Sequence, residues 1–103
     1  MAGEKLSFQE LINSSTPVLV DFYADWCGPC KMMSPIIEQL ATEMGDKMKV
    51  IKIDVDKNAQ LSDKYQIRGI PTFMLFQNGK ILWQQAGAMS GSQLKSMLQK
   101  HVK

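Results

Sequence analysis

Cysteine and histidine are scarce in this sequence, which limits the metal sites that it can form. The 103 residues include two cysteines, Cys27 and Cys30, and one histidine, His101. A structural zinc ion usually takes four ligands from Cys and His, so at least one ligand is missing. We therefore expect no metal site within the chain, and nothing in the sequence indicates a zinc ion shared between two chains.

Long hydrophobic runs and blocks of like charge are also absent. No apolar stretch approaches the ~20 residues that a membrane-spanning helix needs, and the first fifteen residues lack the apolar segment of a secretory signal. The 12 basic and 10 acidic residues are scattered, without the basic patch of a nucleic-acid-binding surface. These absences predict a cytoplasmic protein without a membrane or nucleic-acid partner.

Helix signals are clear at four places. Capping-box spacing predicts helix starts at Ser7 and Ser90, and Asn58 is expected to cap a short helix that runs to about Tyr65. Apolar residues at helical spacing from 33 to 44 predict one long amphipathic helix that ends at Gly45. The eight methionines fall mostly on such apolar helix faces, so we interpret them as core filling, with a soft binding surface as the alternative.

Strand-like runs alternate with these helices. They occupy residues 18–24, 48–56, 72–77 and 80–86. A strand, a long helix and a second strand predict a right-handed parallel unit, and Asn78-Gly79 joins the last two runs as an antiparallel hairpin. We therefore predict a single α/β domain over residues 1–103, with a mixed central sheet and helices on both faces.

The two cysteines lie between a predicted strand and the start of the long helix, three positions apart. In a reducing cytosol such a pair is more often redox-active than a permanent disulfide. The helix N-terminus would stabilise a thiolate, which is the nucleophilic form, and the spacing allows a disulfide to close without backbone movement. Cys27 is predicted to be the exposed attacking thiol and Cys30 its more enclosed partner. Gly28 leaves room for another chain, and Pro29 suits the first helical turn.

Three segments, DFYADWCGPCK, IRGIPTFMLFQNGK and GAMSGSQLKSML, resemble the thioredoxin family over nearly the whole chain. Trp26-Cys27-Gly28-Pro29-Cys30 matches the active-site motif of that family. The resemblance implies the thioredoxin fold and a protein-disulfide reductase, in which Cys27 forms a mixed disulfide with the substrate and Cys30 resolves it. It also implies disulfide-containing protein substrates, a flavoprotein thioredoxin reductase that draws on NADPH, and no cofactor bound to this chain.

The resemblance assigns proton transfer to Asp21, a buried carboxylate that would accept the Cys30 proton through water. Burial of an unpaired carboxylate costs free energy, so its place in an apolar strand indicates a functional role. The alternative is an aspartate that simply reaches solvent at the end of the strand. Lys52 lies in the adjacent strand of the family fold and would hold a charge against Asp21, unless it is simply an exposed strand lysine.

Other matched positions belong to the substrate side of the family's site. Pro71 matches a cis-proline that faces the cysteines and leaves the backbone of Ile70 free to pair with an extended substrate. Gly87 and Ala88 match a second substrate loop. Trp26 would form an apolar docking patch with Ile70, although a tryptophan beside a helix start is often only packing.

Two features depart from the family pattern. Tyr23 stands where many thioredoxins have tryptophan, and only MAGEKLS precedes the first helix. We therefore expect four clear strands and a fifth that is short or missing, in a monomer. Two other functions stay open: a binding module with the same fold, in which the thiols are incidental, and a dedicated oxidant or isomerase.

Overall fold

The computed structural model describes residues 7–102, and within them four strands form one sheet. The strands are β1 (Val18–Tyr23), β2 (Lys49–Asp54), β3 (Thr72–Gln77) and β4 (Lys80–Ala86). The helices are α1 (Phe8–Ile12), α2 (Gly28–Met44), α3 (Ala59–Lys64) and α4 (Gly91–His101), with a short 3-10 helix, η1 (Gly45–Lys47). The strand order is β2-β1-β3-β4; β1 and β2 are parallel, and the other neighbours are antiparallel. The predicted mixed α/β sheet is confirmed.

Local sequence signals explain where several of these elements begin and end. Capping boxes start α1 and α4 as predicted. The hydroxyls of Ser7 and Ser90 accept hydrogen bonds from the backbone N–H groups of Glu10 and Gln93, and the side chains of Glu10 and Gln93 accept from the backbone N–H groups of the two serines. Gly45 ends α2 with a φ of 55°. Asn78 and Gly79, with φ values of 54° and 78°, form the two-residue turn between β3 and β4.

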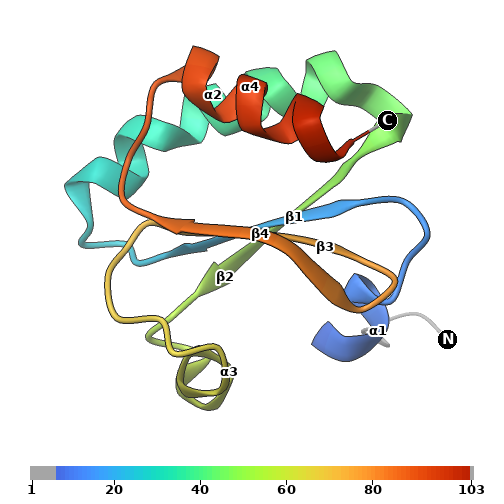
Figure 1. The fold of residues 1–103 in the computed structure, drawn as a ribbon. Helices are drawn as coiled ribbons and strands as arrows, with labels where there is room; N and C mark the ends of the chain where they lie inside the picture. Colours follow the sequence, from blue (N-terminus) through green and yellow to red (C-terminus); the bar gives the residue numbers. More distant parts are fainter. Residues whose placement is uncertain (1–6, 103) are drawn as a thin grey trace, which may run out of the picture.

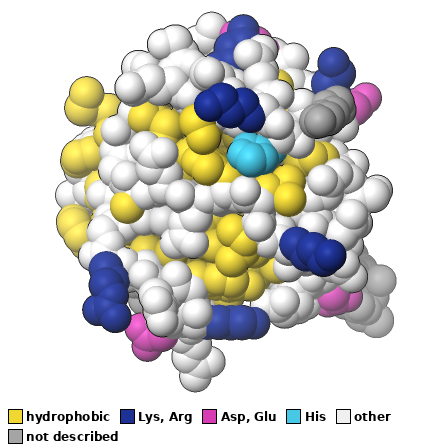
Figure 2. Space-filling view, in the orientation of Figure 1, with side chains coloured by type: hydrophobic (Ala, Val, Ile, Leu, Met, Phe, Trp, Pro, Cys, Tyr) yellow, Lys and Arg dark blue, Asp and Glu magenta, His cyan; other side chains and the backbone are white. Residues whose placement is uncertain are grey.

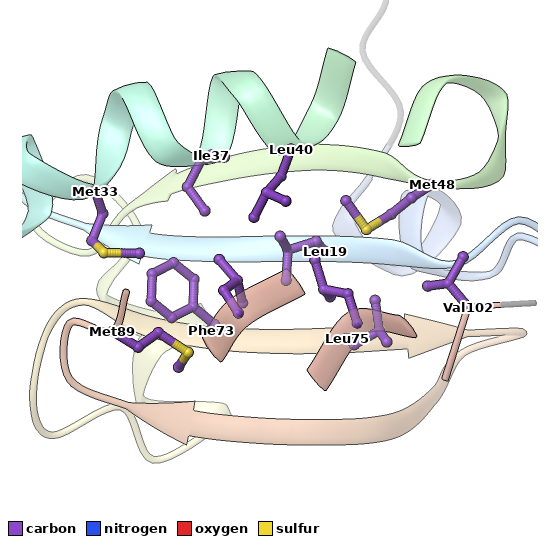
Figure 3. Packing of buried hydrophobic residues seen from close by; sticks show 11 residues of the cluster. Leu19, Met33, Ile37, Leu40, Met48, Phe73, Leu75, Met89 and Val102 are labelled. Carbon is purple, nitrogen blue, oxygen red and sulfur yellow. The ribbon is translucent and has the colours of Figure 1, made fainter. Parts of the chain in front are cut away.

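The helices cover both faces of the sheet, as predicted (Figure 1). α2 and α4 lie on one face, and α1 and α3 lie on the other. Figure 3 shows the first of these layers, where side chains from α2 point toward those of the two central strands. The buried side chains at this contact are Met33, Ile37, Leu40, Leu19, Phe73 and Leu75. Burial of such side chains supplies ~1.5–3 kcal/mol each, which fixes α2 firmly on the sheet.

The opposite face is filled by aromatic and β-branched side chains. Phe76 of β3 packs edge-on against Phe8 of α1 and against Tyr65 at the end of α3, with ring centroids 5.8 and 5.6 Å apart. Since side chains alternate along a strand, Val18, Val20 and Phe22 enter this second core. The intervening residues of β1, Leu19, Asp21 and Tyr23, therefore face α2, which places a carboxylate beneath that helix.

The expected cap at Asn58 is wrong, and the expected fifth strand lies outside the residues that the structure describes. Asn58 precedes α3, but its side-chain amide donates to the carbonyl of Asp54 (2.9 Å), so the side chain does not cap the helix. The expected short or missing fifth strand would involve residues before Ser7, outside the described residues. No helix within residues 7–102 is long and apolar enough to cross a membrane.

Candidate active site

Cys27 and Cys30 form a disulfide at the junction between β1 and α2. Their Cα atoms are 5.3 Å apart, inside the range that a disulfide accepts. Cys27 is the N-cap of α2, and its Sγ accepts a hydrogen bond from the backbone N–H of Cys30 (3.1 Å). The Cys27 sulfur therefore lies at the positive end of the helix dipole, where a thiolate is stabilised.

The predicted difference in exposure between the two cysteines is wrong for this state. Cys27 and Cys30 are each 4% exposed. The disulfide lies in a small apolar cluster with Ala24, and Tyr23 and Ile70 pack against it. Because the sulfurs are bonded to each other and enclosed by the same neighbours, burial does not distinguish them; the hydrogen bond to Cys27 Sγ does.

One further loop reaches the disulfide, and a second loop is hydrogen-bonded to the first. The Ile70-Pro71 peptide bond is cis, as the family resemblance implied. The carbonyl oxygen of Ile70 lies 3.8 Å from Cys27 Sγ, so this backbone reaches the reactive sulfur. Gly87, with a φ of 97° that favours glycine, donates its N–H to the carbonyl of Pro71 (2.7 Å). This bond joins the loop of Gly87 and exposed Ala88 to the proline loop.

The other residues that the family resemblance assigned to the substrate side lie on the outer surface. Gly28 and Pro29 are exposed, and nothing lies within 4 Å of the position that a Cβ on Gly28 would take. Trp26 is 70% exposed, and its indole Nε1–H donates to Asp56 Oδ2 at 2.8 Å. Exposed though it is, the indole is therefore held in one orientation beside the disulfide.

Sequence reasoning missed Asp56 as a partner of Trp26. A signal existed: Trp26 follows β1 and Asp56 follows β2, and the carboxyl ends of neighbouring parallel strands meet at one edge of the sheet. Ser34, which accepts a hydrogen bond from Lys52, was also missed. Only its position four residues after Cys30 on one helix could have indicated it.

Asp21 is buried beneath α2, with 1% of its surface exposed. Within residues 7–102, neither carboxylate oxygen has a hydrogen-bond partner. Burial disfavours the charged form and raises the pKa of Asp21 from 3.8 to about 6, and the positive charge of Lys52 partly opposes this rise. A carboxyl group with this pKa can exchange a proton near neutral pH.

Lys52 stands opposite Asp21 in the register of the parallel strands β1 and β2. Its ammonium donates to Ser34 Oγ (3.3 Å) and lies 5.0 Å from the centre of the Tyr23 ring. These side chains line a hollow of about 150 Å³ that reaches Cys30. Its lining residues are Tyr23, Ala24, Asp25, Cys30, Lys31, Ser34 and Lys52. A polar hollow of this size has room for water next to the inner cysteine.

The arrangement therefore combines a cysteine pair at disulfide-bonding distance, a buried carboxyl group on the face of the sheet that α2 covers, and the Ile70 backbone beside Cys27 Sγ. Within the described range, no group of three or more His, Cys, Asp or Glu side chains is placed to hold a metal ion. His101 lies in the last turn of α4 and is half-buried.

Comparison with known proteins agrees with this geometry. The family model described as thioredoxin matches residues 2–100. Thioredoxin from Acidithiobacillus ferridurans is 48% identical over 89 residues, which are 86% of this chain and 82% of the relative. Thioredoxin from Pseudomonas aeruginosa is 43% identical over 94 residues, which are 91% of this chain and 87% of the relative.

The fold agrees with a solved structure as well. A point mutant of thioredoxin from Halobacterium salinarum matches with a TM-score of 0.80 at 39% identity, over 91% of this chain and 84% of that chain. The family, fold and oxidoreductase function expected from the sequence are thereby confirmed. The chain belongs to the thioredoxin family of protein-disulfide oxidoreductases.

Proposed function

We propose that this chain reduces disulfide bonds of other proteins, with Cys27 as the attacking thiol and Cys30 as the resolving thiol. The observation that carries the assignment is the position of Cys27 as N-cap of α2, with the Cys30 N–H directed at its sulfur. This hydrogen bond and the helix dipole favour the thiolate on Cys27.

The reaction proceeds by two exchanges. The reduced Cys27 thiolate attacks one sulfur of the substrate disulfide, which breaks that bond, forms a mixed disulfide and releases the other substrate sulfur as a thiolate. Cys30 loses its proton and attacks Cys27 Sγ, which breaks the mixed disulfide and forms the Cys27–Cys30 bond. The substrate leaves as a dithiol, and this chain has lost two electrons to it. The Cα separation of 5.3 Å allows the second exchange without backbone movement.

Asp21 takes the proton of Cys30 in this proposal. The carboxylate is buried on the α2 face, its pKa of about 6 leaves it mostly ionised at pH 7, and it has no hydrogen-bond partner among residues 7–102 to compete for it. The hollow beside Cys30 and Lys52 has room for water, which would take part in this transfer. Lys52 acts as a positioning charge that lowers the pKa of Asp21 and so favours the carboxylate form, which accepts the proton.

The docking surface surrounds the disulfide. An extended substrate would pair with the backbone of Ile70 and lie against exposed apolar groups. The residues assigned to this surface are exposed Trp26, Gly28, Pro29 and Ala88, half-buried Ile70 and Gly87, and Pro71, whose ring is buried beside them. The hydrogen bonds from Trp26 to Asp56 and from Gly87 to Pro71 hold parts of this surface in place before substrate binds.

The partners follow from the chemistry of the cycle. Each turnover leaves the chain oxidised, so a reductant must restore the dithiol, and a flavoprotein thioredoxin reductase that draws on NADPH fits this role. Electrons would pass from NADPH through the reductase and this chain to the substrate, with no cofactor bound here. We place this activity in the cytoplasm, in redox homeostasis, with residues 1–103 acting as a monomeric single domain.

Basic side chains are scattered singly over the face shown in Figure 2, which fits a protein without a nucleic-acid partner.

Reduction of insulin disulfides in the presence of a thioredoxin reductase and NADPH tests this function. We expect NADPH consumption that depends on both the chain and insulin. The control is the double variant Cys27→Ser with Cys30→Ser, which should support none. A wild-type rate equal to that of the double variant would contradict the proposal.

A further inference from the structure

Met32 differs from the other methionines of the described chain. Of the seven methionines in residues 7–102, four are buried (Met33, Met48, Met74 and Met89), two are half-buried (Met44 and Met97), and Met32 is 74% exposed. The prediction that methionines fill the core is therefore right for the four buried ones and for Met44, which packs against the core, and wrong for Met32. Because the Met32 thioether is exposed to water, we looked for a role other than core packing.

The place of Met32 suggests what that role is. It lies in α2 two residues after Cys30, and it follows Gly28 and Pro29 by four and three residues. Residues at these spacings share one helix face, and a helical side chain leans back over the turn that precedes it. Met32 therefore stands over the turn of exposed Gly28 and Pro29, where the space around Gly28 is open.

Exposed apolar surface is concentrated around the disulfide. Three large hydrophobic side chains are strongly exposed in the described part of the chain: Trp26 at 70%, Met32 at 74% and Ile81 at 51%. Two of them flank the cysteine pair, one before Cys27 and one after Cys30. Figure 2 shows hydrophobic side chains along the margin of the molecule on the side where α2 begins in Figure 1. A substrate that reaches Cys27 across Gly28 and Pro29 would meet Met32 next.

We propose that Met32 is an oxidation-sensitive contact for the protein substrates of the disulfide site; this inference rests on the proposed function. In the thioether form, Met32 packs against apolar groups that flank the substrate disulfide. Hydrogen peroxide transfers one oxygen atom to the sulfur, its O–O bond breaks, and water leaves; the sulfur loses the two electrons that the peroxide gains. The sulfoxide is polar and hydrated, so its burial beneath a substrate is unfavourable and docking weakens.

The test begins with the disulfide form of the protein, because bonded cysteines are protected from the peroxide. Peptide mass spectrometry should find that Met32 gains an oxygen atom before any other methionine of residues 7–102, since it is the most exposed of them. The treated protein should then show a KM for insulin raised about three- to tenfold with a smaller change in kcat, because the contact acts in docking. Its rate with a small aromatic disulfide, which does not extend along α2, should not change.

Two variants serve as controls, each compared with its own untreated sample. Met32→Leu removes the oxidisable sulfur, so peroxide should not alter its KM. Met97→Leu removes a half-buried thioether on α4, 4.0 Å from Lys100 Nζ, and should respond to peroxide as the wild type does. The inference is overturned if Met32 sulfoxide forms and KM stays the same, if Met32→Leu shows the same loss, or if another methionine of residues 7–102 is oxidised first. Failure of the proposed function would instead appear as no insulin reduction by the untreated protein.

Discussion

Asp21 and Lys52 are direct partners in the register of β1 and β2, yet the Lys52 ammonium donates to Ser34 rather than to the carboxylate. Asp21 is left without a hydrogen bond from residues 7–102. Lys52 still lowers the pKa of Asp21 through its charge, but burial has the larger effect and the pKa stays raised, at about 6. This relationship makes both the stability and the release step of this protein depend on pH.

Asp21 should reduce stability at neutral pH. Its pKa is about 6 when folded against 3.8 ordinarily, so the folded state binds the proton more tightly. The contribution of Asp21 to the free energy of unfolding should therefore be highest below pH ~4, fall as the pH rises to about 6, and stay low above that. At ~1.4 kcal/mol for each tenfold change in proton affinity, the penalty at pH 7 is ~3 kcal/mol. Asp21→Asn should raise stability at pH 7 by up to that amount.

Urea unfolding of the oxidised proteins at pH 4 and pH 7 measures this effect. The stability difference between Asp21→Asn and wild type should be large at pH 7 and small at pH 4. Asp46→Asn, at an exposed aspartate of η1, is the matched control and should show no such pattern. A difference that does not vary with pH would show that the carboxylate is not the cause.

Asp21→Asn should also slow release of the substrate. Cys27 can still attack, but Cys30 has lost its proton acceptor, so the mixed disulfide should persist. In single-turnover experiments we expect release at pH 7 to slow by about tenfold or more. The wild-type release rate should rise as the pH passes about 6, and the variant should lack this rise. Identical release profiles for the two proteins would remove Asp21 from the mechanism.

Lys52→Gln should raise the pKa of Asp21 above its wild-type value, because a neighbouring positive charge that favours the carboxylate is lost. Titration of the Asp21 side-chain carbon by NMR measures this directly. Lys49→Gln, at an exposed lysine of the same strand, should leave the titration where it is. If both variants titrate like the wild type, Lys52 does not act on the carboxylate.

Asp56→Ala should release the Trp26 indole from its fixed orientation, because the acceptor of the 2.8 Å hydrogen bond is removed. Both side chains are exposed, so we expect stability to change by less than ~1 kcal/mol. The KM for insulin should rise about threefold or more, since the docking surface is no longer pre-organised. Asp56→Asn keeps an acceptor oxygen and should have a smaller effect; equal KM values for all three proteins would argue against this role of Trp26.

Sequence reasoning worked where a signal is local. The capping residues Ser7 and Ser90 and the Asn78-Gly79 turn act on adjacent backbone, so their effect can be inferred without the fold. The position of Cys27 at the start of α2 follows for the same reason.

Other features depend on which segments the fold brings together. The partner of Trp26 is thirty residues away along the chain, and the partner of Lys52 is on a different element. The equal burial of Cys27 and Cys30 depends on the loop at Ile70. The exposure of Met32 beside buried Met33 depends on how α2 is rotated on the sheet, which the spacing of methionines alone does not fix.

Capture of substrates by single-cysteine variants tests the central claim most directly. Cys30→Ser removes the thiol that resolves the mixed disulfide, so covalent complexes with disulfide-containing proteins should accumulate and disappear on addition of dithiothreitol. Cys27→Ser should form few complexes, because the remaining thiol lacks the N-cap position that favours a thiolate. Full turnover by Cys30→Ser, or partner binding that is indifferent to dithiothreitol, would contradict the assignment and favour a non-covalent binding module.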